Sequence, residues 1–357
     1  MGLKAMKEIQ NLPFFFIIGR PRSGTTLLRT LLDAHSFVKV PPEYPVILKL
    51  YNRFGKLKSW SAEDVEAFDA AFRQKLPSEY WKLEYLNIDE IRLKQLLGKL
   101  PTDAKFTDFI KVHYSCYQSV YPTTELKILG DKNPVFATYV KRLMKIFPEA
   151  RFIFLTRDYR DNFVSVRRFS FEAPIVALQA YRWKYVTRMM LGLKKQFPNR
   201  ILHIRHEDVI ASAPETLSTV CDFLGIEMDM GMLDFYKKKD EVYNMISSAH
   251  FDKFHSGLGQ PINPSRMGLW EEKLTDNEVK TADAVVGIWA ERAGYKRKYT
   301  YCSASIILKT IPWQLYGYFL YQLMSFAEFL PPGLRKHFAR FLPMLARIWH
   351  RYFKKDK

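Results

Sequence analysis

Two arginines stand in a short loop that lies between Gly19 and Gly24 and directly follows an apolar run. The run, Phe14 to Ile18, shows no polar alternation, which is typical of a strand buried on both faces. After the loop, leucines recur with helical spacing over 25–34. A strand, a glycine-bounded loop and a helix N-terminus together form an anion site, because the loop amides converge and the helix dipole adds positive potential. This segment therefore predicts a phosphate-binding loop.

The loop differs from a nucleoside-triphosphate loop at one position. It has the glycine spacing of the G-x-x-x-x-G-K-[ST] motif, but Thr25 stands where that motif has lysine, and the cation is Arg22. The string 21–26, Pro-Arg-Ser-Gly-Thr-Thr, resembles the loop with which sulfotransferases bind the 5′-phosphosulfate end of 3′-phosphoadenosine 5′-phosphosulfate (PAPS). The resemblance implies that the cofactor contacts include Arg20, Arg22, Ser23, Gly24, Thr25 and Thr26.

Three later segments extend this resemblance. Arg157 is followed eight residues later by Ser165, as in the family's clamp on the 3′-phosphate of PAPS. A guanidinium suits this role because it can pair a dianion bidentately. The alternative is that Arg157 pairs with a neighbouring aspartate. The string 266–270 resembles the late loop that folds over the nucleotide, which implies contacts from Arg266 and Gly268. His206 stands where the family often has a tyrosine that lines the adenine pocket.

Candidate catalytic residues follow from the same resemblance. The first forty residues look most like the tyrosylprotein branch, in which a glutamate at the place of Glu43 is the catalytic base. Many small-molecule sulfotransferases use a histidine two residues beyond a conserved lysine, but here Pro134 stands two residues beyond Lys132. His113 is the alternative base. The resemblance implies that Arg22 holds the leaving 5′-phosphate, Lys132 stabilises the bridging oxygen and Glu43 takes the acceptor's proton. The alternative for Glu43 is an exposed loop acid without a catalytic role. The alternative for Lys132 is a surface lysine.

Alternating apolar runs and helical patterns predict the fold that must position these residues. The expected strands are 14–18, 37–40, 126–129, 151–156 and 201–205. Helical segments between strands imply right-handed crossovers and a parallel sheet. We expect an α/β, P-loop-type three-layer fold, with a central parallel sheet flanked by helices and a C-terminal helical extension. A sulfotransferase domain would span 1–300 with a helical insert at about 61–120, and a basic amphipathic helical tail would span 301–357.

The tail leaves two interpretations open. Residues 310–327 carry no charge, but Pro312 and several polar residues make them a weak membrane span. From 334 to 352, large apolar residues recur at helical spacing between lysines and arginines. Such a basic amphipathic helix can lie peripherally in a lipid interface, or it can pack on the globular domain and turn its basic face to solvent.

The composition of the chain limits the classes of function that it can have. The 357 residues carry a formal net charge of +18, which favours anionic partners. The three cysteines are widely spaced and odd in number, which indicates neither a disulfide framework nor a zinc site and favours a reducing compartment. Arginines directly after the first apolar run are not typical of a secretory signal. We therefore expect a cytoplasmic protein, and a lipid-binding tail would place it peripherally on the inner membrane face.

The leading hypothesis is a PAPS-dependent sulfotransferase that needs no metal and acts on a hydroxyl acceptor. Many aromatic residues and the basic tail favour a hydrophobic alcohol, such as a sterol or lipid, while tyrosyl peptides and carbohydrates stay open. One alternative is a P-loop nucleotide or sugar kinase. The other is a basic membrane- or nucleic-acid-binding module, but charge alone is weak support for nucleic acid and we expect none as a partner.

Overall fold

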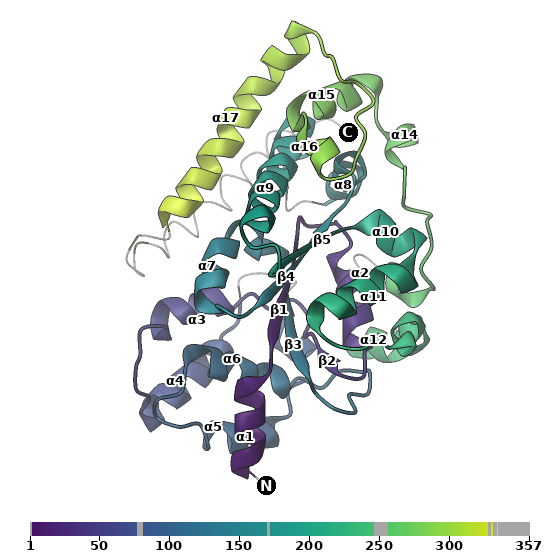
Figure 1. Ribbon diagram of the computed structural model, residues 1–357. Helices are drawn as coiled ribbons and strands as arrows, with labels where there is room; N and C mark the ends of the chain where they lie inside the picture. The colour runs from purple at the N-terminus through teal and green to yellow at the C-terminus, as the bar shows by residue number, and fades with distance from the viewer. Residues whose placement is uncertain are drawn as a thin grey trace.

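The computed structural model describes residues 2–76, 81–169, 172–245 and 256–327, together with Leu330 and Leu334. Its centre is a five-stranded sheet in the order β2-β3-β1-β4-β5, and every neighbouring pair is parallel. The strands are β1 (Phe14–Gly19), β2 (Val38–Lys39), β3 (Ile128–Lys132), β4 (Arg151–Thr156) and β5 (Ile201–Arg205). The predicted α/β class and parallel sheet are confirmed (Figure 1).

Helices cover both faces of the sheet (Figure 1). One face packs mainly on helices of the first half of the chain, which are α3 (Ile47–Phe54), α4 (Ala62–Phe72), α6 (Phe106–Ser115) and α7 (Val140–Ile146). The other face packs on α2 (Thr25–Asp33), α10 (His206–Ala211), α11 (Ala213–Leu224), η3 (Met230–Lys238), α12 (Lys239–Met245) and η4 (Ser256–Gly259). The remaining elements are α1 (Gly2–Asn11), η1 (Leu83–Leu86), α5 (Glu90–Leu97), η2 (Pro134–Thr138), α8 (Tyr159–Val166), α9 (Val176–Gln196), α14 (Trp270–Lys273), α15 (Asp276–Val286), α16 (Trp289–Arg292) and α17 (Ala304–Ala327).

The first strand is buried on both faces, as its unbroken apolar run predicts. Successive side chains of a strand point to opposite faces. Accordingly Phe14, Phe16 and Ile18 join one hydrophobic cluster, whereas Phe15 and Ile17 join the other. The strand therefore anchors the loop that follows it in the middle of the molecule.

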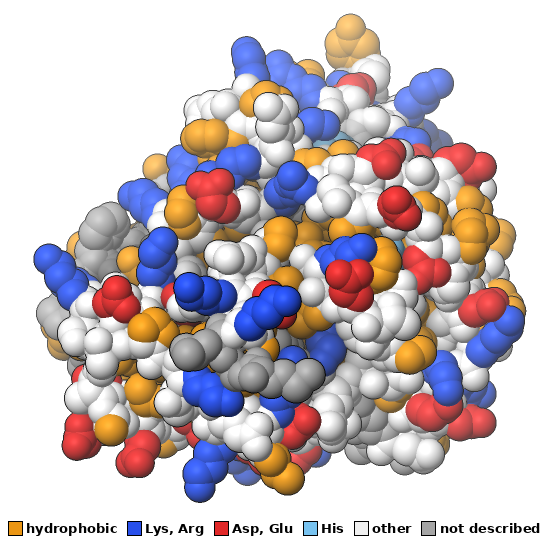
Figure 2. All heavy atoms as spheres, turned by 60° about the horizontal axis from the view of Figure 1, so that its bottom comes forward, with side chains coloured by type: hydrophobic (Ala, Val, Ile, Leu, Met, Phe, Trp, Pro, Cys, Tyr) orange, Lys and Arg blue, Asp and Glu red, His pale blue; other side chains and the backbone are white. Residues whose placement is uncertain are grey.

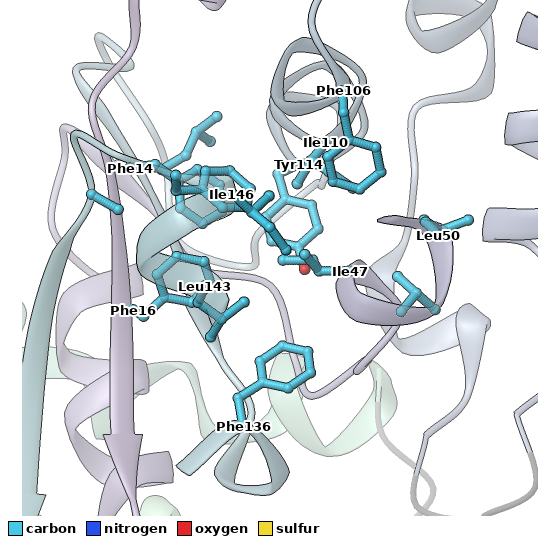
Figure 3. Close-up of a cluster of buried hydrophobic side chains, with 14 of the residues drawn as sticks. Phe14, Phe16, Ile47, Leu50, Phe106, Ile110, Tyr114, Phe136, Leu143 and Ile146 are labelled. Atoms are coloured by element: carbon cyan, nitrogen blue, oxygen red, sulfur yellow. The ribbon is translucent and has the colours of Figure 1, made fainter. Parts of the chain in front are cut away.

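Helices between β2 and β3 pack against this strand. Figure 3 shows Ile47 and Leu50 of α3 facing the cluster that contains Phe16 of β1 and Tyr114 of α6. The predicted helical stretch is confirmed in α4, η1, α5 and α6, and the capping box expected at Ser61 is formed. The structure adds α3, which begins before the predicted insert and fixes the end of the proline-rich loop at 41–45.

Two local features differ from the expectations drawn from the sequence. The N-terminal helix α1 was not expected, because its short pattern precedes a much stronger strand signal. The third strand runs to Lys132, not 126–129, because the polar pair Gly130 and Asp131 continues the ladder opposite β1. The chain after Thr310 forms part of α17, which packs against α9 and α15. The amphipathic stretch predicted at 334–352 lies outside the described residues except for Leu334.

Charges of both signs share the surface that Figure 2 shows. Lysine and arginine side chains are interspersed there with aspartate and glutamate, and apolar side chains occur in small groups between them. Among the residues that the structure describes, no helix has the length and apolarity needed to cross a bilayer.

Candidate active site

The predicted phosphate-binding loop is tightly curled at the carboxyl end of β1. Arg22 and Gly24 both have positive φ, at 68° and 89°, and α2 begins directly afterwards at Thr25. Alternating backbone conformations of this kind turn successive amides toward one point, which makes an anion-binding concavity. Asn162 of α8 holds the loop, because its Nδ2 donates to the Pro21 carbonyl at 2.8 Å and to the Ser23 hydroxyl at 3.3 Å. Nothing in the sequence pattern indicated this asparagine.

Arg22 and Ser165 meet although they lie far apart in the chain. The Arg22 Nε donates to the Ser165 hydroxyl at 3.2 Å, and its guanidinium lies 4.7 Å from the centre of the Phe169 ring. Burial, together with repulsion from Arg157 and Arg266, lowers the pKa of Arg22 to about 10. Crowding of like charges around the buried Arg157 is unfavourable in isolation and is relieved by a bound anion.

Arg157 closes this cluster from the end of β4. Its Nη1 donates to the Arg22 carbonyl at 3.4 Å, and its Nη2 donates to the Arg266 carbonyl. Its Nε is buried and has no hydrogen-bond partner. The neighbouring aspartates have other partners, because Asp158 pairs with Arg160 at 2.7 Å and Asp161 accepts backbone amides. The alternative of a simple Arg157–aspartate pair is therefore not what the structure shows.

The loop at 266–270 is fastened to α8 by Asp161. One carboxylate oxygen accepts the Gly268 amide at 2.8 Å, and the other accepts the Trp270 amide at 2.9 Å. Arg160 stacks on the Trp270 ring, with its guanidinium carbon 3.7 Å from the ring centre. Asp161 and Arg160 thus hold the Arg-Met-Gly-Leu-Trp string against α8. Its predicted fold over the nucleotide stays a prediction.

His206 covers the phosphate-binding loop from the end of β5. A Cβ at Gly24 would lie 2.2 Å from the His206 Nδ1, so only glycine fits under this ring. The Nδ1 is buried without a hydrogen-bond partner. Burial and the nearby Arg157 lower the pKa of His206 to about 3, which keeps the ring neutral at pH 7. The adjacent Glu207 has a structural role, because it accepts the Asp158 amide and the Tyr295 hydroxyl, both at 2.9 Å.

Lys132 and Glu43 meet at the end of β3. Lys132 is only 2% exposed, forms an ion pair with Glu43 and donates to the Thr26 hydroxyl at 3.1 Å. Burial lowers the pKa of Lys132, and the Glu43 carboxylate opposes that shift. The Glu43 loop is held by its neighbour Tyr44, whose hydroxyl donates to the Phe72 carbonyl at 2.9 Å. Lys132 is therefore not a surface lysine, and Glu43, 29% exposed and paired with Lys132, is not simply an exposed loop acid.

Two residues singled out in the sequence face elsewhere. The Arg20 Nη2 donates to the side chains of Glu172 and Gln179, both at 2.7 Å, beneath the loop. Its predicted contact with the cofactor stays a prediction. His113 is buried in α6 and bonds the Phe109 carbonyl at 2.7 Å and the Asp69 carboxylate at 3.0 Å. These contacts give the imidazole a structural role and not that of the alternative base.

Comparisons with known proteins show the family to which this chain is related. A family model described as "Sulfotransferase family" matches residues 13–230, a range that includes every predicted site residue except Arg266 and Gly268. Protein-tyrosine sulfotransferase 1 of Danio rerio is 24% identical over 294 residues, which cover 80% of this chain and 73% of the relative. Protein-tyrosine sulfotransferase A of Caenorhabditis elegans is 22% identical over 289 residues, covering 79% and 67%.

Solved structures share the fold. The sulfotransferase domain from the curacin biosynthetic pathway superposes with a TM-score of 0.55 at 20% identity, over 80% of this chain and 99% of that one. The sulfotransferase domain from the Synechococcus PCC 7002 olefin synthase gives a TM-score of 0.50 at 20% identity, over 86% and 94%. At this level of identity the likeness concerns the arrangement of the sheet and its helices.

Proposed function

The chain belongs to the sulfotransferase family, and we propose that it transfers a sulfuryl group from PAPS to a hydroxyl acceptor. The observation that carries this proposal is the contact between Lys132, Glu43 and the Thr26 hydroxyl. One buried ammonium thereby joins a carboxylate to the phosphate-binding loop. This is the arrangement that an in-line transfer from a loop-bound donor to an activated hydroxyl requires.

The residues around the loop fit PAPS. Arg22, Thr25, Thr26 and the loop amides would hold the 5′ end, while Arg157, Ser165 and Arg266 would hold the 3′-phosphate. The buried Nε of Arg157 supports this assignment, because a phosphate oxygen would accept its unused hydrogen bond. When bound, PAPS supplies an activated sulfuryl group whose leaving group is the 5′-phosphate.

Glu43 is proposed as the base and Lys132 as the residue that stabilises the leaving oxygen. In the ion pair the Glu43 carboxylate accepts from the Lys132 ammonium. As Lys132 turns toward charge developing on the leaving oxygen, the Glu43 carboxylate is released and can accept the proton of the acceptor hydroxyl. A positioned base of this kind contributes about 10²–10⁴-fold to the rate.

Carbohydrates stay open as acceptors, but two other acceptor classes have specific support. We favour a hydrophobic alcohol such as a sterol or lipid, because of the apolar helix at the C-terminal side of the chain. A tyrosyl residue of a peptide is the second candidate, since two relatives are protein-tyrosine sulfotransferases. We also propose a cytoplasmic location, which the three free cysteines support.

Ligand-induced stabilisation tests the donor. Adenosine 3′,5′-bisphosphate, the product of PAPS, is expected to raise the melting temperature, whereas ATP with Mg²⁺ is expected to raise it little. The reverse order would contradict the proposal and favour the kinase alternative. Incubation with labelled PAPS and either a lipid extract or a tyrosyl peptide would then identify the acceptor from the labelled product.

A further inference from the structure

The outer face of α17 is apolar and exposed. We define this face by Ile307, Leu308, Ile311, Leu315, Tyr318, Phe319 and Phe326. Their side chains are between 40% and 64% exposed, and their spacing follows the helical period, so they form one stripe along the helix. Single exposed apolar side chains are ordinary, but seven on one face of a helix, interrupted only towards its end by Gln322 and Ser325, mark an interaction surface.

The opposite face of α17 already has its partner within the domain. Gly317 lies so close to α9 that a Cβ there would meet Tyr181 at 2.6 Å. Tyr321 stacks on Tyr185 with ring centres 4.2 Å apart, and both Leu320 and Tyr321 are buried. Burial against α9 and α15 therefore accounts for one side of this helix only. The outer face needs a different explanation.

Charge distribution points to the partner. Residues 310–327 contain no charged side chain, whereas 330–357 contain eight lysines and arginines and one acidic residue, Asp356. An anionic lipid surface accommodates both properties, because apolar side chains enter the acyl boundary while basic residues attract the headgroups. A second copy of this chain would cover the apolar stripe but carries the same net charge of +18, so the two copies repel each other.

We propose that the outer face of α17 binds peripherally to an anionic bilayer. This inference goes beyond the transfer reaction, and vesicle binding can be measured without turnover. The helix is also linked to the active site, since α9 carries Gln179 and Arg182, and both belong to the cluster around Glu172 and Arg20. Membrane binding would thus hold the phosphate-binding loop in a fixed orientation to the bilayer.

Vesicle cosedimentation of the full chain tests the proposal. Two vesicle types are compared, phosphatidylcholine alone and a three-to-one mixture of phosphatidylcholine with phosphatidylglycerol. We expect binding to the mixed vesicles that weakens with salt. The double variant Leu315→Ser/Phe319→Ser should lose about tenfold or more in partition coefficient, because both side chains would leave the acyl boundary. Both are exposed, so the melting temperature should change little.

The matched control removes two equally exposed apolar side chains elsewhere. Ile91 on α5 and Met230 on η3 are 76% and 61% exposed, and Ile91→Ser/Met230→Ser should bind vesicles like the wild type. No binding to mixed vesicles, or an equal loss in both double variants, would overturn the proposal. A concentration-dependent dimer in sedimentation that only Leu315→Ser/Phe319→Ser dissolves, without vesicle binding, would also overturn it and assign the stripe to a second copy.

Discussion

Lys132 and Glu43 form an ion pair at the carboxyl end of the sheet although they lie 89 residues apart in the chain. The same ammonium donates to the Thr26 hydroxyl, so one side chain touches both the candidate base and the loop that would hold the donor. Changes to this pair should therefore act on transfer more than on nucleotide binding.

Glu43→Gln should lower kcat by about 10²–10⁴-fold, because an amide cannot take the acceptor's proton. Affinity for adenosine 3′,5′-bisphosphate should change only a few-fold, since the loop and the arginine cluster stay in place. Initial rates with labelled PAPS measure the first quantity and titration calorimetry the second.

Glu125→Gln is the control for this substitution. Glu125 is exposed and pairs with Lys127 at 3.2 Å, so its loss should leave turnover unchanged. Full turnover by Glu43→Gln would remove Glu43 from the mechanism.

Arg157→Ala should weaken binding of adenosine 3′,5′-bisphosphate by about two orders of magnitude, as expected for the loss of a buried charged partner. Binding of adenosine 5′-monophosphate should fall much less, because that nucleotide lacks the 3′-phosphate. Arg167→Ala is the matched control, since Arg167 donates to the Lys273 carbonyl outside the cluster. Equal losses for the two nucleotides would refute the assignment of Arg157 to the 3′-phosphate.

Arg20→Ala should reduce stability more than nucleotide affinity. It would leave the buried Glu172 with Arg182 as its remaining cationic partner, at 3.3 Å, and should cost about 3 kcal/mol in the free energy of unfolding. Urea denaturation measures this loss, and Arg20→Met/Glu172→Met should recover part of it. An Arg20→Ala protein of normal stability that no longer binds adenosine 3′,5′-bisphosphate would restore the cofactor contact predicted from the sequence.

The loop and the sheet were predictable because their signals are local. The apolar run before Gly19 indicates a strand buried on both faces, and the Arg22-to-Thr26 string indicates the turn that follows it. The pattern of Arg157 and Ser165 could also be recognised in the sequence, because Arg157 directly follows a strand and Ser165 lies on the next helix. Each of these patterns fits within about a dozen residues.

Residues that hold the site together gave no such signal. Asn162 supports the loop from more than a hundred residues away, and Asp161 fixes the Gly268 loop across a similar separation. Asparagine and aspartate in a first helical turn are ordinary at capping positions, so their types alone say nothing about distant partners. Lys132 lies beyond the strand predicted at 126–129, because a Gly-Asp pair is unusual inside a buried strand.

Asp131 should make stability depend on pH. Burial raises its pKa from 3.8 to about 7, although Tyr114 and Asn133 donate to it. Because the folded pKa exceeds the unfolded one, the favourable contribution is present below about pH 4 and is lost as pH rises to about 7. The free energy of unfolding of Asp131→Asn, relative to that of the wild type, should therefore increase from pH 5 to pH 8, by the order of a few kcal/mol.

Chemical denaturation of both proteins at the two pH values measures this change. Asp103→Asn, at an exposed position, is the control and should show the wild-type pH dependence. A constant stability difference between Asp131→Asn and the wild type would show that Asp131 does not titrate in this range.

Gly24 and His206 should be energetically coupled. Gly24→Ala would place a Cβ 2.2 Å from the His206 Nδ1 and would also put alanine at a φ of 89°, which costs about 1–2 kcal/mol by itself. His206→Ala removes the steric conflict but leaves the cost of the backbone conformation. The double variant should thus be less destabilised than the sum of the two single variants, by a coupling energy of about 0.5–3 kcal/mol. Urea denaturation of the four proteins gives this coupling, and additive effects would contradict the placement of His206 over the phosphate-binding loop.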